Sequence, residues 1–97
     1  MDQKNTVVHP GKILLEKFIK PLNLNQNQLA IALHVPPRRI NEIVLCKRRI
    51  TADTALRLAR YFNNKPEYWL GLQMDHDLNL AEKAAGEKIR KEVTPRP

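Results

Sequence analysis

The sequence predicts an all-α domain built from five helices. Apolar residues recur at helical spacing along most of the 97 residues. No segment shows the sustained alternation that a half-buried strand needs, and Pro, Asn or Thr stands where each helix should begin. The length leaves room for one modest hydrophobic core. We therefore expect residues 1–97 to form a single domain.

The first helix is predicted to begin at Pro10, because the fixed φ of proline suits a first helical turn. Ile13, Leu14 and Phe18 then share one face at helical spacing. Pro21 should end the segment, since a proline inside a helix removes a backbone hydrogen bond. The prediction is one amphipathic helix between the two prolines.

Residues 25–45 have the length pattern of a helix-turn-helix unit, with a helix of about nine residues, a turn of about four and a second helix. Asn25 is a good N-cap, and Gln28 stands three positions later, as in a capping box. Pro37 suits the first turn of the second helix. The apolar residues with the spacing to pack these two helices across each other are Leu29, Ala30, Leu33, Val35, Ile40 and Ile43.

Two further helices are expected beyond this unit. Thr51 caps the fourth helix, because its hydroxyl can accept a hydrogen bond from the first turn. The buried stripe of that helix is predicted to be Ala55, Leu58, Ala59 and Phe62. Pro66 begins a C-terminal helical segment over residues 66–92, which Gly86 weakens, and residues 93–97 should fray.

The positive charge is concentrated in the middle of the chain. Of a net charge of +7, residues 36–60 carry +5, residues 1–35 carry +2 and residues 61–97 are neutral overall. The middle segment is rich in arginine, whose planar fork suits phosphates and guanine edges. Clustered positive charge is typical of nucleic-acid binders, although a solvated basic face would show the same composition.

The packing of the helix-turn-helix unit should turn Arg38, Asn41 and Glu42 outward, with Arg39 at the border of that face. In such units the N-terminal residues of the second helix meet base edges in the major groove. Arginine can bond bidentately to guanine, and asparagine to adenine. We therefore predict that the helix led by Pro37 reads double-stranded DNA.

Other residues around this helix are expected to hold the DNA backbone. Gln26 and Gln28 lie at the first turn of the preceding helix, where backbone N–H groups favour an anion. A basic loop then follows the reading helix, and its side chains would act as positioning contacts to phosphates. These loop residues are Lys47, Arg48 and Arg49. Arg57 and Arg60 are interpreted as a solvated helix face rather than as phosphate contacts.

No pattern in the sequence predicts an enzyme, a cofactor or a metal site. The three histidines share no metal-ligand spacing, and the single cysteine, Cys46, has no organised base and cannot form an internal disulfide. No run approaches the roughly 20 apolar residues of a membrane span, and the N-terminus has no signal-peptide core. We expect a non-enzymatic, cytoplasmic protein without cofactors or membrane contact.

Several strings of this sequence resemble the HigA-type antitoxins of toxin–antitoxin modules, a branch of the lambda-repressor-like, Xre-type helix-turn-helix regulators. The resemblance extends over residues 9–72 and includes all five helices. Its strings are His9-Pro10-Gly11, Leu29-Ala30, VPPRRINEI at 35–43, ITADTALRLA at 50–59 and PEYWL at 66–70. The resemblance implies a lambda-repressor-like fold and a homodimer that binds an operator in its own promoter. It also implies that the chain neutralises a RelE-like toxin that cleaves mRNA on the ribosome.

Three positions depart from the pattern of that family. His34 and Cys46 stand where the family usually has glycine, and Arg49 replaces a small residue. The two glycine positions are expected to adopt positive φ, at a cost of about 1 kcal/mol or more for other residues. The departures therefore bear on the geometry of two loops rather than on the fold.

Two other functions remain open from the sequence. One is a stand-alone helix-turn-helix transcriptional repressor without a toxin partner. The other is a protein-interaction module that mainly inhibits an enzyme and binds DNA only secondarily. Both an antitoxin that binds its operator and a stand-alone repressor must form a dimer, because two half-sites about one turn apart have to be read. The fifth helix and the C-terminal segment are the expected dimer contact.

Overall fold

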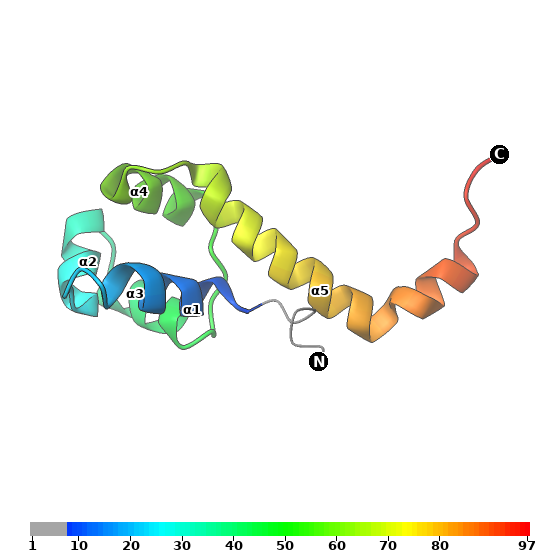
Figure 1. The fold of residues 1–97 in the computed structure, drawn as a ribbon, viewed down its shortest axis with the longest axis horizontal. Helices are drawn as coiled ribbons and strands as arrows, with labels where there is room; N and C mark the ends of the chain where they lie inside the picture. The colour runs from blue at the N-terminus through cyan, green and yellow to red at the C-terminus, as the bar shows by residue number, and fades with distance from the viewer. Residues whose placement is uncertain (1–7) are drawn as a thin grey trace.

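The computed structural model describes residues 8–97, and within that range every regular element is a helix (Figure 1). The elements are α1 (Pro10–Ile13), η2 (Leu14–Ile19), α2 (Gln26–Leu33), α3 (Pro37–Val44), α4 (Ala52–Phe62) and α5 (Pro66–Glu92). Helices α1 and η2 follow each other without a break and together form the first predicted helix. The all-α, five-helix prediction is therefore confirmed.

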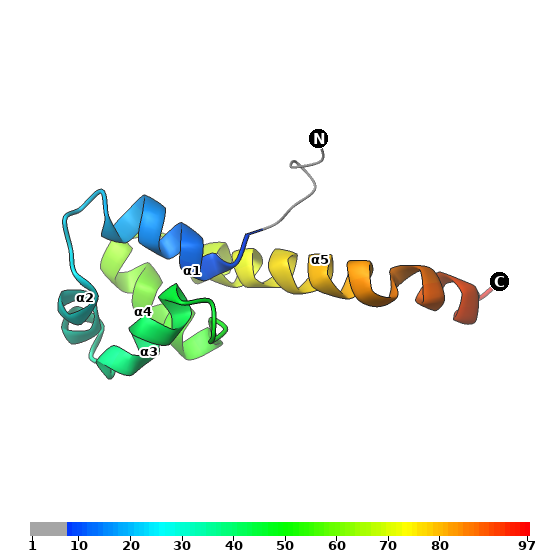
Figure 2. The same ribbon diagram turned by 90° about the horizontal axis from the view of Figure 1, so that it is seen from below.

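The molecule consists of a compact body and a long protruding helix. Helices α1 to α4 gather at one end, and α5 runs from α4 past α1 and then extends away from the body (Figures 1 and 2). This extension makes the principal extents 51 × 31 × 22 Å. The first half of α5 thus belongs to the core, while its second half has no other helix of residues 8–97 beside it (Figure 2).

The first helical segment differs from the α-helix that its sequence predicted. Leu14–Ile19 is a π-helix, in which backbone N–H groups bond to carbonyls five residues back, as Lys20 does to Leu15 at 3.0 Å. The wider turn brings both Leu14 and Ile19, which are five residues apart, into the core. The spacing of the apolar residues was also compatible with an α-helix. Only the packing in the structure shows that a π-helix is the form that buries Leu14 and Ile19 together.

The helix-turn-helix unit begins as the sequence predicted. The side chain of Asn25 accepts a hydrogen bond from the backbone N–H of Gln28 at 2.8 Å, and the side chain of Gln28 accepts one from the backbone N–H of Asn25 at 2.9 Å. This reciprocal pair is a capping box. His34 ends α2 in the left-handed conformation with φ 58°, and Cys46 follows α3 with φ 63°. Both residues have the positive φ that their places in the family pattern implied.

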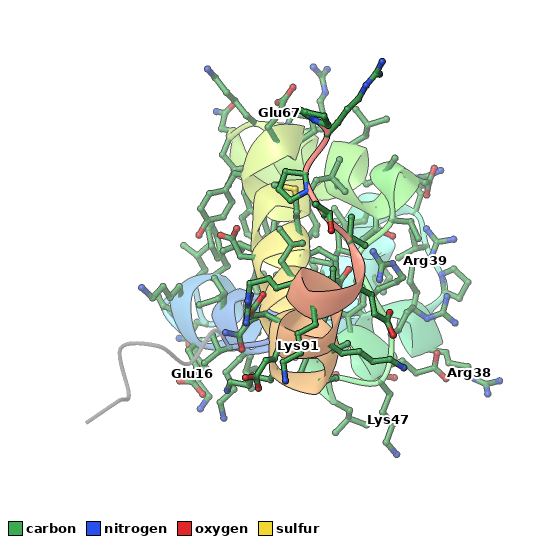
Figure 3. All side chains as sticks on the ribbon, turned by 90° about the vertical axis from the view of Figure 1, so that its right-hand side faces the viewer. Glu16, Arg38, Arg39, Lys47, Glu67 and Lys91 are labelled. Carbon is green, nitrogen blue, oxygen red and sulfur yellow. The ribbon has the colours of Figure 1, made fainter. Side chains whose placement is uncertain are left out.

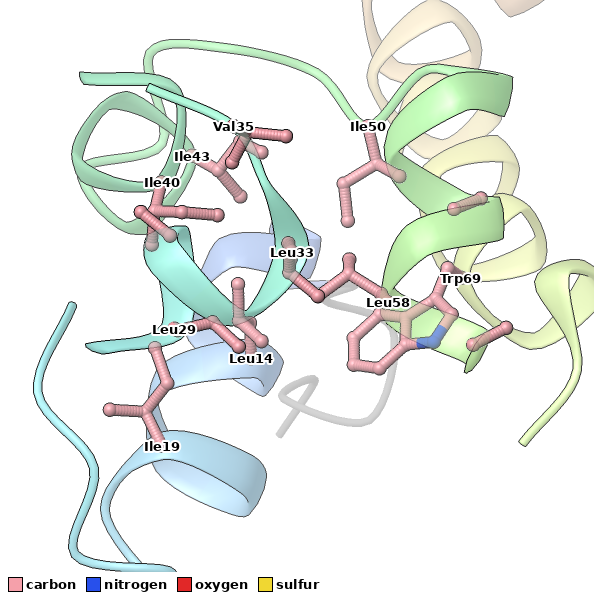
Figure 4. Packing of buried hydrophobic residues seen from close by; sticks show 13 residues of the cluster. Leu14, Ile19, Leu29, Leu33, Val35, Ile40, Ile43, Ile50, Leu58 and Trp69 are labelled. Carbon is pink, nitrogen blue, oxygen red and sulfur yellow. The ribbon is translucent and has the colours of Figure 1, made fainter. Parts of the chain in front are cut away.

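The core lies where the four helices of the body meet the start of α5 (Figure 4). Trp69 is fully buried, and its indole N–H donates to the side-chain oxygen of Asn64 at 2.9 Å. Phe18 from η2 lies against the Trp69 ring with centroids 4.8 Å apart. Buried leucines and isoleucines from every helix of the body surround this contact, and burial of such side chains stabilises the fold by roughly 1.5–3 kcal/mol each.

The string His9-Pro10-Gly11 joins α1 to α3. The Nδ1 atom of His9 accepts a hydrogen bond from the backbone N–H of Gly11 at 2.9 Å and so caps α1. A Cβ atom added at Gly11 would lie only 1.8 Å from the carbonyl oxygen of Ile43. Glycine is therefore needed at this position because the backbones of α1 and α3 approach each other too closely for any side chain.

Candidate nucleic-acid interface

Helix α3 carries an exposed basic face at its N-terminal end. The Arg38 side chain is 82% exposed, whereas Arg39 is only 28% exposed at the border of the face. Figure 3 shows Arg38, Arg39 and Lys47 on one side of the molecule and Glu16 on the other. Ile40 and Ile43 bury the opposite side of the helix. The outward orientation predicted for the start of this helix is thus observed.

A hydrogen bond connects the two helices of the unit at this surface. The side-chain nitrogen of Asn41 on α3 donates to the side-chain oxygen of Gln26 in the first turn of α2, at 2.5 Å. The contact brings together two residues that the sequence assigned to different roles, base reading and phosphate binding. Gln28 lies in the same turn of α2, where the oxygen of its side chain is engaged in the capping box.

Glu42 is the acceptor for two arginines of this face. The Nε atom of Arg38 donates to one carboxylate oxygen at 2.9 Å, and Arg48 donates to the other oxygen through Nε at 2.9 Å and through a terminal nitrogen at 2.7 Å. Arg38 lies one helical turn before Glu42, and Arg48 comes from the loop that follows α3. A single carboxylate therefore joins the start of the helix to the basic loop.

Arg39 and Arg57 share a second carboxylate, that of Asp53 on α4. Arg39 donates to one Asp53 oxygen at 2.7 Å, and Arg57 donates to the same oxygen at 2.9 Å. Arg57 also donates to the backbone carbonyl of Leu33 at the end of α2, at 2.9 Å. The Arg57 side chain is 40% exposed, but it is more than a solvated side chain, because its guanidinium bonds a carbonyl in the last turn of α2 that the helix itself leaves without a partner.

The loop that carries Lys47, Arg48 and Arg49 is held by α5. Buried Gln73 accepts a hydrogen bond from the backbone N–H of Ile50 at 2.7 Å and donates to Asp77 at 3.0 Å. Asp77 also pairs with Arg49 at 2.8 Å. Arg49, predicted as a phosphate contact, is therefore bound to α5 by an ion pair at the edge of the basic face.

These carboxylates remain ionised at neutral pH. Hydrogen bonds from Arg38 and then Arg48 hold the pKa of Glu42 below its usual value, and bonds from Arg57 and Arg39 lower the pKa of Asp53. The pKa of Asp77 is lowered chiefly by the hydrogen bond from Gln73 and then by the one from Arg49. Sequence reasoning missed this set of partners, although the i, i+4 spacings 38–42 and 53–57 would have indicated two of the pairs.

The arrangement offers hydrogen-bond donors rather than reactive groups. The guanidinium groups of Arg38 and Arg39 lie in the first turn of α3, and the amide of Asn41 lies one turn further along. The basic loop follows the other end of the helix. Within residues 8–97, no three side chains of the His, Cys, Asp or Glu type are grouped so as to hold a metal ion. In the same range, every helix is too short or too polar to cross a membrane.

Two helices joined by a short turn, the second exposed and basic at its start, define a helix-turn-helix protein. The sequence model of that family (HTH_3) matches residues 15–70. The virulence-associated protein I of Dichelobacter nodosus is 56% identical over 75 residues, which are 77% of this chain and 69% of that protein. An addiction module antidote protein of a HigA family from Coxiella burnetii has a solved structure with 47% identity and a TM-score of 0.89. The match covers 94% of this chain and 99% of that one.

A third relative has been solved together with nucleic acid. It is the antitoxin HigA of Pseudomonas aeruginosa with the higBA promoter, at 37% identity and a TM-score of 0.89 over 94% of this chain and 99% of that one. The present chain belongs to the HigA branch of the helix-turn-helix family. Because this is a family of non-enzymatic regulators, the expectation that the chain is not an enzyme is confirmed.

Proposed function

We propose that this protein is a DNA-binding antitoxin that represses its own promoter. The observation that carries the proposal is the exposed N-terminal end of α3, where Arg38 and Asn41 stand beside the first turn of α2. A relative with the same fold is solved with the promoter of its module. A regulator of this kind works in the compartment that holds the DNA, which in a bacterium is the cytoplasm.

The proposed interface divides into residues that read bases and residues that hold phosphates. Arg38 and Asn41 are the base readers, since each can form two hydrogen bonds to one purine. Arg39, fixed by Asp53, and Pro37 set the start of the reading helix. The backbone-holding set comprises Gln26, Gln28, Lys47, Arg48 and Arg49. Phosphate contacts position the protein, and base contacts give it sequence preference.

The proposed assembly on DNA is a homodimer joined through the part of α5 from Leu78 onward. This part carries exposed apolar residues, with Leu78 and Ile89 lining a shallow groove together with Ala81 and Gly86. Leu78, Ala81, Ala85 and Ile89 follow helical spacing, which places them along one stripe. A second copy could cover this stripe and place two α3 helices on successive half-sites of an operator.

The proposed protein partner is a toxin of the RelE-like fold that cleaves mRNA, neutralised by complex formation. Support comes from family membership and from the antitoxin named among the solved relatives. The surface of residues 61–97, which are neutral overall, is the part of the molecule proposed for the contact with the toxin.

The DNA assignment is tested with the duplex upstream of the protein's own reading frame and a scrambled duplex of equal length. Arg38→Ala should weaken binding to the promoter by about tenfold or more and reduce the preference over the scrambled duplex. Lys20→Ala removes one positive charge from an exposed pair with Glu16, away from the basic face, and serves as the matched control. Equal promoter binding by Arg38→Ala and the wild type would contradict the assignment.

The toxin assignment is tested by co-expression with the neighbouring reading frame. A tagged copy of this chain should co-purify with the product of that frame and relieve its growth arrest. Promoter binding without any co-purifying protein would instead establish the stand-alone repressor. Co-purification without promoter binding would favour the protein-interaction module whose main task is to inhibit an enzyme.

A further inference from the structure

Glu42 occupies an unusual position for an acidic residue. Between Pro37 and Arg49 the sequence contains five cations, and Glu42 is the one acid among them. Its side chain is 27% exposed and lies on the same face of α3 as Arg38. An anion here works against attraction to DNA, so its presence calls for a physical explanation.

Stability supplies only part of that explanation. The Arg38 partner is almost fully exposed, and an ion pair of that kind contributes little to folding. The pair with Arg48 spans from the middle of α3 to the following loop, so the carboxylate holds two guanidiniums that belong to different elements. What the contact controls is the availability of these two arginines to another anion.

Resting on the proposed function, we propose that Glu42 is a specificity determinant of the DNA interface. On DNA of any sequence its carboxylate repels the phosphates nearest to Arg48 and competes with them for both arginines. At the operator, the amino group of a cytosine beside the guanine read by Arg38 donates to Glu42 and compensates for the repulsion. Acidic side chains accept from cytosine N4 in this way.

The charge of Glu42 should affect non-operator DNA and the operator differently. Binding to arbitrary DNA depends on phosphate contacts and on counterion release, so a negative charge at the interface weakens it throughout. Binding to the operator recovers the loss through one base contact. Glu42 should therefore lower the affinity for non-operator DNA more than it lowers the affinity for the operator.

The experiment compares the wild type with Glu42→Gln, which keeps the shape of the side chain and removes its charge. Affinity is measured for the protein's own promoter duplex and for a scrambled duplex at several salt concentrations between 50 and 200 mM. Glu42→Gln should bind the scrambled duplex about three- to tenfold more tightly, with a steeper dependence on salt. Its affinity for the promoter should change less, so that the ratio of the two affinities falls severalfold.

Glu16→Gln is the matched control, because it removes the same charge from an exposed pair on the opposite side of the molecule (Figure 3). It should leave the ratio unchanged. An unchanged ratio in Glu42→Gln, or a change that Glu16→Gln reproduces, would overturn the proposal. Thermal unfolding of both variants, followed by circular dichroism, checks that they are folded.

A second measurement locates the base. Each C·G pair of the promoter duplex is replaced in turn, and one replacement per half-site should weaken the wild type while leaving Glu42→Ala, which has no side-chain acceptor, unaffected. If no such pair exists, the cytosine contact is wrong. A wild type without preference for its own promoter would defeat the proposed function, whereas a preference that Glu42→Gln fully retains would defeat only the role of Glu42.

Discussion

At the scale of single residues, the backbone is left-handed at four residues of the described range that are not glycine. His34, Cys46, Asn23 and Asn63 have φ between 58° and 63°. Asparagine tolerates this conformation through local hydrogen bonding, and histidine is also enriched there. Cys46 has no such advantage, and its position is set by the reversal of the chain after α3.

Replacing Cys46 with glycine should stabilise the protein by about 0.5–1 kcal/mol, because glycine adopts the left-handed conformation without strain. The larger entropy of the unfolded chain with glycine offsets part of this gain. The free energy of unfolding in urea measures the effect. Leu45→Gly, at an adjacent exposed residue with φ −81°, should instead destabilise it. A Cys46→Gly variant no more stable than the wild type would show that the backbone strain is compensated locally.

His9 couples proton binding to the start of α1. Its Nδ1 atom must be unprotonated to accept from Gly11, and its ring lies 4.9 Å from that of His76. Burial, and then the charge of His76, lower the pKa of His9, while Asp77 acts in the opposite direction. As the pH falls below about 6.5, the unfolded chain therefore takes up this proton before the folded chain does.

Stability should consequently decrease as the pH is lowered from 7.5 through 6.5 towards the lowered pKa of His9. His9→Asn keeps an N-cap acceptor but removes the titrating group, so its stability should vary less over this window. Urea unfolding at a series of pH values provides the comparison. His34→Asn, the same substitution at an exposed position outside α1, is measured as the control, and an unchanged slope in His9→Asn would refute the coupling.

At the scale of elements, the contact between α1 and α3 sets how the reading helix is held. The backbones meet at Gly11 and the carbonyl oxygen of Ile43, where a methyl group has no room. Gly71, in the first half of α5, presents the opposite case, since a Cβ atom there would meet no other atom within 4 Å. The two glycines make a matched pair with opposite expectations.

Gly11→Ala should destabilise the fold by about 1–3 kcal/mol, because α1 must move away from the end of α3. Gly71→Ala should stabilise it by about 0.5–1 kcal/mol, as expected inside a helix with free space. Thermal unfolding of both variants gives the comparison. Similar melting temperatures for Gly11→Ala and the wild type would mean that the close approach is not a constraint.

At the scale of the whole molecule, α5 serves two parts of the structure. Its first half closes the core with Trp69 and positions the basic loop through Gln73. Its second half leaves the body and exposes apolar residues (Figure 1). Because α5 connects the core to the proposed dimer contact, it would set the distance between the two α3 helices of a dimer.

Leu78→Glu should therefore convert the proposed dimer into a monomer and weaken promoter binding by at least about tenfold, since one half-site contact is lost. Sedimentation equilibrium and the binding assay measure both effects. Leu56→Glu changes a leucine of equal exposure on α4, 60% against 61%, and should remain a dimer. Dimerisation of Leu78→Glu as strong as that of the wild type would exclude the stripe that begins at Leu78 as the contact.

The sequence was a reliable guide wherever local chemistry decides the outcome. Asn25 with Gln28, Pro37, Thr51 and Pro66 begin their helices as predicted, because capping and proline geometry act within one turn. The predicted orientation of Arg38 also follows from helical spacing. The pairing of Arg39 with Asp53, 14 residues away, depends on how α4 packs and has no local signal.

The sequence by itself determined the helices, the apolar stripes that form the core and the basic character of residues 36–60, since these follow from spacing and composition. The tertiary structure alone decided the π-winding of η2, the bond from Arg57 to α2 and the support that α5 gives to the basic loop. It also showed that the arginines of the basic face are already paired with carboxylates. The bonds from Arg39 to Asp53, from Ile50 to α5 and from Arg57 to α2 join groups 14 or more residues apart. Their partners are therefore chosen by the packing of helices and not by sequence distance.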